Sequence, residues 1–237
     1  MGPLEIKPGI YWVGVVDWNL RNFHGYSQTH QGTTYNAYLV LDDRITLFDT
    51  VAWKYREEFM CQIAQVVDPE KIDQIVVHHV EPDHAGSLPY VVERTKPDTI
   101  YASKMGDKFL RGRFACKEWP LEVVENGQQI SLGKRSAQFA ETRMLHWPDS
   151  MVSYIPEEKL LISQDAFGQN IASSERFDDW IDWPELKREM AHYFANIILP
   201  YSAKVPKALE AVQALGWDIE MIAPDHGLIL HKYAADA

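Results

Sequence analysis

The 237-residue chain has little cysteine, few basic residues and no long apolar run. Its two cysteines, Cys61 and Cys116, lie far apart and form no C-x-x-C pair, which excludes a disulfide framework and a rubredoxin-type iron site. We expect both thiols to be buried, and a reducing cytoplasm is the compartment that such a composition indicates. The N-terminal residues 1–11 lack the basic and apolar regions of a signal peptide.

The shortage of positive charge narrows the range of partners. Lysine and arginine number 23 against 34 aspartate and glutamate residues, giving a formal net charge of −11. Nucleic-acid phosphates and anionic membrane surfaces would both be repelled by such a chain. No segment is long enough to cross a bilayer. We therefore expect neither nucleic acid nor membrane as a partner.

What is present is the composition of an ordinary globular protein, 46% hydrophobic and 24% charged. The length suits one large domain or two small ones, and no low-complexity linker divides the chain, so we expect one domain over residues 1–237. Short apolar, β-branched segments alternate with segments of helical periodicity, which predicts helices packed on sheets in an α/β sandwich. Strands are predicted at residues 10–17, 34–40, 44–50, 72–77, 99–102, 120–124, 129–132, 137–141, 151–155, 159–163 and 221–223. Helices are predicted at residues 53–67, 85–95, 104–114, 183–193 and 206–215.

One seven-residue segment, His78 to His84, concentrates side chains that bind metals. It reads H-H-V-E-P-D-H, with three imidazoles and two carboxylates. Apolar residues precede it, and a helical pattern follows it, so it is predicted to be a loop between a buried strand and a helix. Loops at strand ends are common locations for binding and catalytic residues.

An extended backbone would bring alternate side chains of this segment to one side. His79, Glu81 and Asp83 would then converge, and Pro82 favours an extended conformation at Glu81. Imidazole and carboxylate together suit first-row transition metals, and a carboxylate-rich set favours iron or manganese over thiolate-bound zinc. The alternative is that these are solvated loop residues, which is the commoner role for any one of them alone.

Residues of the same chemistry follow three later strands. His146, Asp165 and His226 each lie just after a predicted strand. One such residue is more often structural than metal-binding, but four strand-end clusters in one chain indicate a shared site. Asp49, at the end of an earlier strand, is interpreted either as a residue that orients a ligand or as a residue of a helix N-terminus or turn.

The series His79-x-Glu81-x-Asp83-His84 with His146, Asp165 and His226 resembles the metallo-β-lactamase superfamily site in the form found in flavodiiron proteins. Hydrolytic members of the superfamily carry H-x-H-x-D-H, whereas this chain has Glu81 in place of the second histidine. The likeness extends to residues 17–18, 23–26, 32–39, 144–150 and 167–170. It implies the four-layer αβ/βα sandwich of the metallo-β-lactamase type and a pair of non-haem iron ions.

The resemblance also implies a role for each residue. It assigns three ligands to one iron: His79, Glu81 and His146. Asp83 and His226 would bind the other iron, and Asp165 would bridge the two. His84 binds the second iron in some members of the family and turns away in others. A bridging hydroxide or oxide would balance three carboxylates against two ferrous ions.

Two tyrosines, Tyr26 and Tyr193, resemble residues that line the gas pocket of the family. Either phenol could donate a hydrogen bond to bound oxygen. The alternative for Tyr193 is a core aromatic residue on an amphipathic helix. His24, in the same loop as Tyr26, is interpreted either as a residue behind the ligands or as an ordinary loop residue.

Full-length flavodiiron proteins carry a flavodoxin-like domain after the diiron domain, and its FMN delivers electrons to the partner subunit of a head-to-tail homodimer. No phosphate-cradling loop occurs between residue 1 and Ala237, so we expect no FMN site within this chain. Electrons would then come from a missing FMN domain, a separate flavoprotein or a rubredoxin-type donor.

Three functions are compatible with the resemblance. The favoured hypothesis is the diiron core of a reductase that converts O2 to water or NO to N2O. The second is a flavin-free diiron sensor that binds O2 or NO and reports to a signalling partner. The third is a hydrolase, which has to be considered because proteins of one fold can differ in function. Glu81, in place of the second histidine of the hydrolytic members, argues against it.

Overall fold

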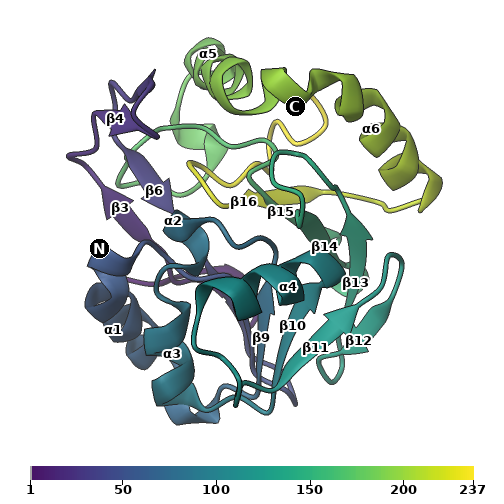
Figure 1. Cartoon of the computed structure of the whole chain (residues 1–237). Coiled ribbons are helices and arrows are strands. Elements are labelled where there is room, and N and C mark those ends of the chain that lie inside the picture. Colours follow the sequence, from purple (N-terminus) through teal and green to yellow (C-terminus); the bar gives the residue numbers. More distant parts are fainter. Residues whose placement is uncertain (1) are drawn as a thin grey trace.

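The computed structural model describes residues 2–237, and two sheets packed face to face form its centre (Figure 1). The first sheet has seven strands, in the spatial order β1 (Leu4–Lys7), β2 (Ile10–Trp12), β7 (Tyr38–Val40), β8 (Thr46–Phe48), β9 (Gln74–Val77), β10 (Thr99–Ser103) and β11 (Leu121–Val124). The second has five, in the order β12 (Gln129–Ser131), β13 (Ser136–Glu141), β14 (Met151–Ile155), β15 (Leu160–Gln164) and β16 (Met221–Pro224). Two small ribbons pair β3 (Val15–Asp17) with β6 (Thr33–Tyr35) and β4 (Asn22–Phe23) with β5 (Ser27–Gln28).

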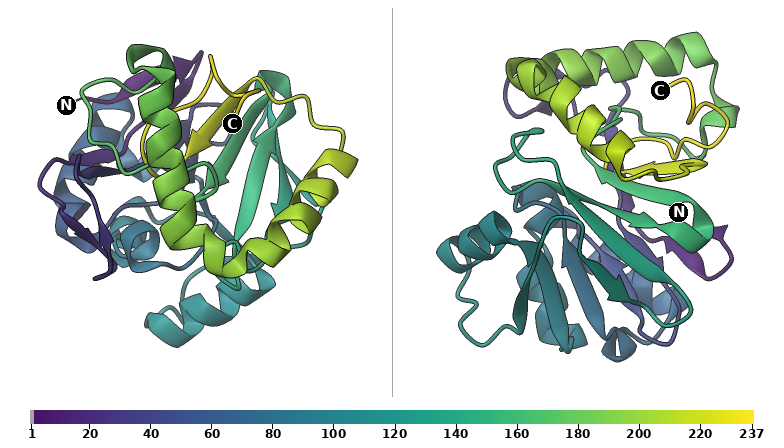
Figure 2. Two further views of the ribbon diagram at one scale, coloured as in Figure 1. Left: turned by 90° about the horizontal axis from the view of Figure 1, so that it is seen from above. Right: turned by 90° about the vertical axis from the view of Figure 1, so that its right-hand side faces the viewer.

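Helices lie outside both sheets. The α-helices are α1 (Arg56–Val66), α2 (Pro82–Ala85), α3 (Leu88–Thr95), α4 (Lys104–Arg113), α5 (Trp183–Tyr193) and α6 (Val205–Ala214). Short 3-10 turns lie at Trp53–Tyr55, Pro69–Lys71, Pro156–Glu158, Asp178–Trp180 and Leu199–Lys204, and a π-helical turn spans Phe194–Ile198. Figure 2 shows the green helices α5 and α6 on the side of the second sheet that faces away from the first. Within residues 2–237, no helix has the length and apolar character needed to cross a membrane.

Three apolar clusters show that the fold has four layers. Residues of α1, α3 and α4, such as Phe59, pack on one face of the first sheet. Its other face, with Trp12 and Phe48, packs against the second sheet through residues such as Phe139. The outer face of the second sheet is covered by α5, including Leu186. Burial on both faces of each sheet confirms the predicted four-layer αβ/βα sandwich.

Most predicted elements are observed, but two predicted strands are divided: residues 34–40 form β6 and β7, in different sheets, and the first strand is divided as well. The predicted strand at residues 10–17 is two strands, β2 in the seven-stranded sheet and β3 in a ribbon with β6. A Cβ atom at Gly14, between them, would lie 2.3 Å from the carbonyl oxygen of Tyr35, so only glycine permits this close crossing. Cys116 is buried as expected, but Cys61 is exposed, so that part of the prediction is wrong.

The metal-binding segment departs from the extended conformation predicted for it. Glu81 is extended, with φ −69° and ψ 143°, but Pro82 is the first residue of the short helix α2. Proline is well suited to this position, because its fixed φ is helical and its missing N–H has no helical partner to lose. The prediction that His79, Glu81 and Asp83 lie on one side of an extended chain is therefore wrong, because Asp83 has turned with the helix.

Parallel pairing brings the ends of four strands to one edge of the sandwich. Strands β8 and β9 are parallel, and so are β15 and β16 in the other sheet. The residues that follow them, Asp49, His78, Asp165 and Asp225, therefore emerge at the same ends of their sheets. This edge carries the candidate site.

Candidate metal centre

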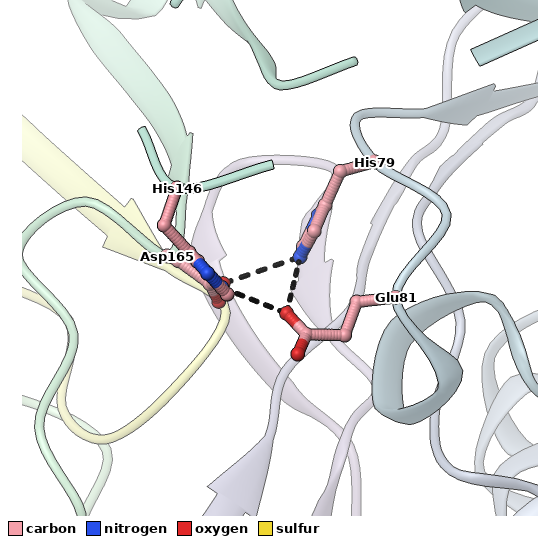
Figure 3. A group of neighbouring side chains, drawn as sticks. All are labelled: His79, Glu81, His146 and Asp165. Atoms are coloured by element: carbon pink, nitrogen blue, oxygen red, sulfur yellow. Dashed lines mark hydrogen bonds and ion pairs between the residues drawn. The ribbon is translucent and has the colours of Figure 1, made fainter. Parts of the chain in front are cut away.

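A first group of donor atoms gathers His79 and Glu81 from the loop after β9, His146 from the loop after β13, and Asp165 from the end of β15 (Figure 3). His146 Nε2 lies 2.8 Å from both Glu81 Oε2 and Asp165 Oδ2. His79 Nε2 lies 3.4 Å from Glu81 Oε2 and 3.2 Å from Asp165 Oδ2. Two imidazoles and two carboxylates thus point at one another, and the group could hold a metal ion.

The loop that carries His146 is held against the second sheet. Gln164, the last residue of β15, donates from Nε2 to the carbonyl oxygen of Leu145 at 2.6 Å. The hydrogen bond joins the residue before His146 to the residue before Asp165. Their side chains are therefore fixed side by side although they lie in separate segments.

A second group, Asp83, His84 and His226, lies beside the first. The Nε2 atoms of His84 and His226 are 3.0 Å apart, and Asp83 Oδ2 lies 3.5 Å from the former and 3.3 Å from the latter. His226 Nδ1 lies 2.6 Å from the carbonyl oxygen of Thr34. A carbonyl oxygen only accepts, so Nδ1 carries the proton, and Nε2 keeps a free lone pair directed at the group.

Asp165 faces both groups with different oxygens. Its Oδ2 is the atom that approaches His79 and His146, as described above. Its Oδ1 lies 3.3 Å from His84 Nε2 and 3.6 Å from His226 Nε2. A carboxylate in this position could contact a metal in each group and hold the two metals close together.

Several buried polar atoms of the two groups make no hydrogen bond with any described residue. They include both ring nitrogens of His79, both oxygens of Asp83, Nδ1 of His84 and Oδ1 of Asp165. Unpaired buried polar atoms are costly and rare in folded proteins. A concentration of them among imidazoles and carboxylates fits residues whose missing partner is a metal ion, so the donor set accommodates a pair of metals.

Charge balance within the groups explains the pKa shifts. Burial alone would lower the pKa of His79 and His84, but the nearby carboxylates outweigh it and raise both. The same competition, with hydrogen bonds from the His146 ring to the carboxylates of Asp165 and Glu81, raises the pKa of His146 to about 9. Burial would raise the pKa of Asp165, but the surrounding histidines hold it well below its usual value. Without metal, the imidazoles therefore hold protons that a metal would displace.

Asp49 supports the first group from behind, without facing either group. Both its oxygens contact His78, one accepting from the backbone N–H at 2.9 Å and the other contacting Nδ1. His78 Nε2 lies 2.7 Å from Ser153 Oγ in β14, so this buried residue ties the two sheets together. Of the two roles considered for Asp49, the orienting one fits this geometry, acting through the residue next to His79.

Further residues around the groups had no clear sequence signal. Asp149 accepts from the backbone N–H of Val80 at 2.8 Å and so fixes the loop between His79 and Glu81. His24 Nε2 lies 3.1 Å from Glu81 Oε1, which favours the interpretation of His24 as a residue behind the ligands. Asp225, immediately before His226, is fully buried beside His84.

The two tyrosines occupy different environments. Tyr193, on α5, is buried, and its ring centroid lies 5.7 Å from that of His226. Burial, followed by the charge of Asp165, raises its pKa well above the ordinary value. Tyr26 is 63% exposed and stacks on His24 at the rim, with 6.2 Å between ring centroids. The structure thus brings Tyr193 beside the second group and leaves Tyr26 at the surface.

Comparisons with known proteins agree with this geometry. The model of the ODP family of β-lactamases matches residues 33–227. The chain is 52% identical over 229 residues to rubredoxin-oxygen oxidoreductase of Megalodesulfovibrio gigas, covering 97% of this chain and 57% of the relative. It is 46% identical over 231 residues to a nitric oxide reductase of Moorella thermoacetica, covering 97% of this chain and 58% of the relative.

The fold is also that of solved relatives. The crystal structure of the flavodiiron protein from Giardia intestinalis superposes with a TM-score of 0.93 at 35% identity, covering 98% of this chain and 56% of that one. The chain therefore spans somewhat more than half the length of the relatives it matches. On the family match, the identities and the superposition together, the chain belongs to the ODP family of metallo-β-lactamase-like proteins and has the flavodiiron core fold.

Proposed function

We propose that this chain is the diiron core of an oxidoreductase that reduces O2, NO or both. The observation that carries the proposal is the position of Asp165, whose two oxygens face two separate groups of imidazole and carboxylate donors. The names of the relatives support the reaction class, since one is a rubredoxin-oxygen oxidoreductase and another a nitric oxide reductase. Neither name favours the sensor or the hydrolase.

In this proposal one iron would be held by His79, Glu81 and His146 of the first group. The other would be held by the second group: Asp83, His84 and His226. Asp165, whose two oxygens face the two sets, would serve both positions. His84 is included because its Nε2 is directed at the second group.

The bound pair would supply two electrons from two ferrous ions, the number required by 2 NO + 2 H⁺ + 2 e⁻ → N2O + H2O. The surrounding residues would keep most water away from that pair, since His79, His84 and His226 are buried. Tyr193, buried beside His226, is the better placed of the two tyrosines to donate a hydrogen bond to a small molecule at the irons. Tyr26 can act only from the rim.

Electron supply and assembly belong to the same proposal. Reduction of O2 to two waters needs four electrons, so repeated turnover needs an external donor, either an FMN domain, a separate flavoprotein or a rubredoxin-type protein. The name of the Megalodesulfovibrio gigas relative pairs rubredoxin with oxygen, which supports such a donor. We also propose a homodimer, by resemblance to the family, and a cytoplasmic location, which the two free cysteines support.

The reaction is tested with chain loaded anaerobically with two ferrous ions and then mixed with NO. We expect about one N2O per chain, by gas chromatography, without any donor protein, and further turnover only when a reduced flavoprotein donor is added. Formation of a lasting NO complex with no N2O would contradict the reductase and indicate a sensor. Zinc-dependent hydrolysis of a lactam or thioester, in protein that takes up no iron, would indicate the hydrolase instead.

A further inference from the structure

Asp225 is a buried carboxylate with no hydrogen-bond partner. It follows β16, its side chain is fully buried, and neither of its oxygens makes a hydrogen bond with any residue in the described part of the chain. Burying a carboxylate without a partner is costly, so such a group is retained only where something nearby compensates for it. The metal-binding assignment proposed above makes no use of this residue.

One unpaired donor beside Asp225 is the ring of His84. Its Nδ1, also buried and without a hydrogen-bond partner, lies 3.6 Å from Asp225 Oδ2. A shift of a few tenths of an ångström would bring this contact into hydrogen-bond range. Each of the two buried groups would then satisfy the other.

The other ring nitrogen of His84 faces the second group. Nε2 lies 3.0 Å from His226 Nε2 and 3.3 Å from Asp165 Oδ1. His226 has the same arrangement, with Nε2 toward the group and Nδ1 against the carbonyl oxygen of Thr34. Imidazoles that bind metals typically donate their second N–H to a carboxylate or carbonyl, which sets the tautomer and the ring orientation.

We propose that Asp225 is a positioning residue that holds His84 with Nε2 directed at the second metal. Asp225 accepts a hydrogen bond from Nδ1–H of His84, as the Thr34 carbonyl oxygen does from Nδ1–H of His226, and it acts through the ring without contacting the metal. This inference rests on the proposed function, because it requires a metal in the second group. It predicts that His84 binds the metal in this chain.

The test is a double-mutant cycle read by metal binding instead of activity. The metal-free full chain, as wild type and as Asp225→Ala, His84→Ala and the double variant, is titrated with Co²⁺ under anaerobic conditions. Visible absorption reports the coordination, and elemental analysis gives the stoichiometry. We expect Asp225→Ala to weaken the affinity for the second Co²⁺ by about 10–100-fold. The affinity for the first Co²⁺ should change by no more than about twofold, the deviation usual for independent sites.

The effect of Asp225→Ala in the wild-type chain and in the His84→Ala chain shows whether Asp225 acts through His84. If Asp225 acts through His84, Asp225→Ala causes no further loss in the His84→Ala protein, and both single variants show the same altered Co²⁺ spectrum at the second position. An equal loss in both backgrounds would overturn the inference, because it would mean direct binding or a general charge effect. Unchanged Co²⁺ affinity in Asp225→Ala would overturn it as well.

Two further variants serve as controls. Asp225→Asn keeps an acceptor oxygen for His84 Nδ1, so it should recover part of the affinity, and it replaces the alanine variant if that protein does not fold. Asp17→Asn changes another buried aspartate, which accepts from Lys54 Nζ and from the backbone N–H of Asn19 and lies in neither donor group, so it should leave Co²⁺ binding unchanged. If wild-type chain binds no second metal, the proposed function and this inference both fail. If it binds two and the cycle shows no coupling, only this inference fails.

Discussion

The two donor groups contain similar residues in different surroundings. The imidazoles of the second group, His84 and His226, are fully buried, and His226 has a backbone acceptor behind it. In the first group His146 keeps a 12% exposed side chain, and the loop of His24 and Tyr26 lies against it. Asp83 of the second group keeps a 13% exposed side chain, whereas the first group's carboxylates, Glu81 and Asp165, are buried. The two groups therefore differ in which ligand type meets the solvent, an imidazole in the first and a carboxylate in the second.

The largest effect is expected where the two groups meet. Asp165→Ala removes the one side chain that faces both, and it leaves His79, His84 and His146 without a shared acceptor. Metal affinity at both positions should fall by more than about 100-fold, because losing a residue that only hydrogen-bonds a ligand already costs up to about 100-fold. Elemental analysis after anaerobic loading measures the remaining metal content. A variant that still binds two ions tightly would show that the groups are independent of Asp165.

A matched pair of variants separates the groups. Glu81→Gln removes a charge from the first group only, and Asp83→Asn removes one from the second only. Each should weaken its own position by about 10–100-fold and the other by about twofold at most. Co²⁺ titration resolves the two steps. Equal losses at both positions in either variant would contradict the division into two groups.

The pH dependence of metal binding follows from His146. Its pKa is raised to about 9 in the metal-free chain, so its contribution to stability is complete below the unfolded value of about 6.5 and is lost as the pH rises through about 9. Asp165, with its lowered pKa, contributes above about pH 4 and loses its contribution as the pH falls further. The metal-free network is therefore most stabilising between about pH 4 and 6.5.

A metal must displace the proton of His146, so its affinity should rise between about pH 6.5 and 9, by about tenfold per pH unit for each proton released. Thermal unfolding with and without Zn²⁺ measures this as a difference in Tm. The difference should widen as the pH is raised across this window. Calorimetry in buffers of different ionisation enthalpy should detect proton release at pH 7. A Tm difference independent of pH would mean that the metal displaces no proton from His146.

The smallest effect is expected at the rim. Tyr26→Ala alters an exposed ring, so the free energy of unfolding should change by less than about 0.5 kcal/mol, and metal content should not change. Tyr193→Phe keeps the buried ring and removes only a hydroxyl, so it should leave metal content unchanged and slow the NO reaction. Urea unfolding and the N2O assay compare the two. A slower reaction in Tyr26→Ala than in Tyr193→Phe would reverse the assignment of the hydrogen-bond donor.

The sequence predicted which residues meet better than it predicted how they meet. All seven expected metal-binding residues gather at one edge: His79, Glu81, Asp83, His84, His146, Asp165 and His226. Their residue types and their positions after strands carried that prediction, because parallel strands end at a common edge. The extended geometry predicted for the segment holds at Glu81, before Pro82, and fails at Asp83, because Pro82 begins a helix.

The residues behind the ligands could not be predicted in the same way. Asp225 and Asp149 are single carboxylates with no spacing pattern, and their partners lie 141 and 69 positions away, at His84 and Val80. Such contacts arise from the packing of one sheet on the other, which local periodicity does not encode. Asp49 was the exception, because its position at the end of a predicted strand already suggested an orienting role as one of its alternatives.

The central claim is that Asp165 links two metal positions within one chain. Mössbauer spectroscopy of protein loaded anaerobically with ⁵⁷Fe tests it most directly, together with an iron count. We predict two irons per chain, which become an exchange-coupled pair on oxidation. One iron per chain, or two that show no magnetic coupling, would contradict the claim.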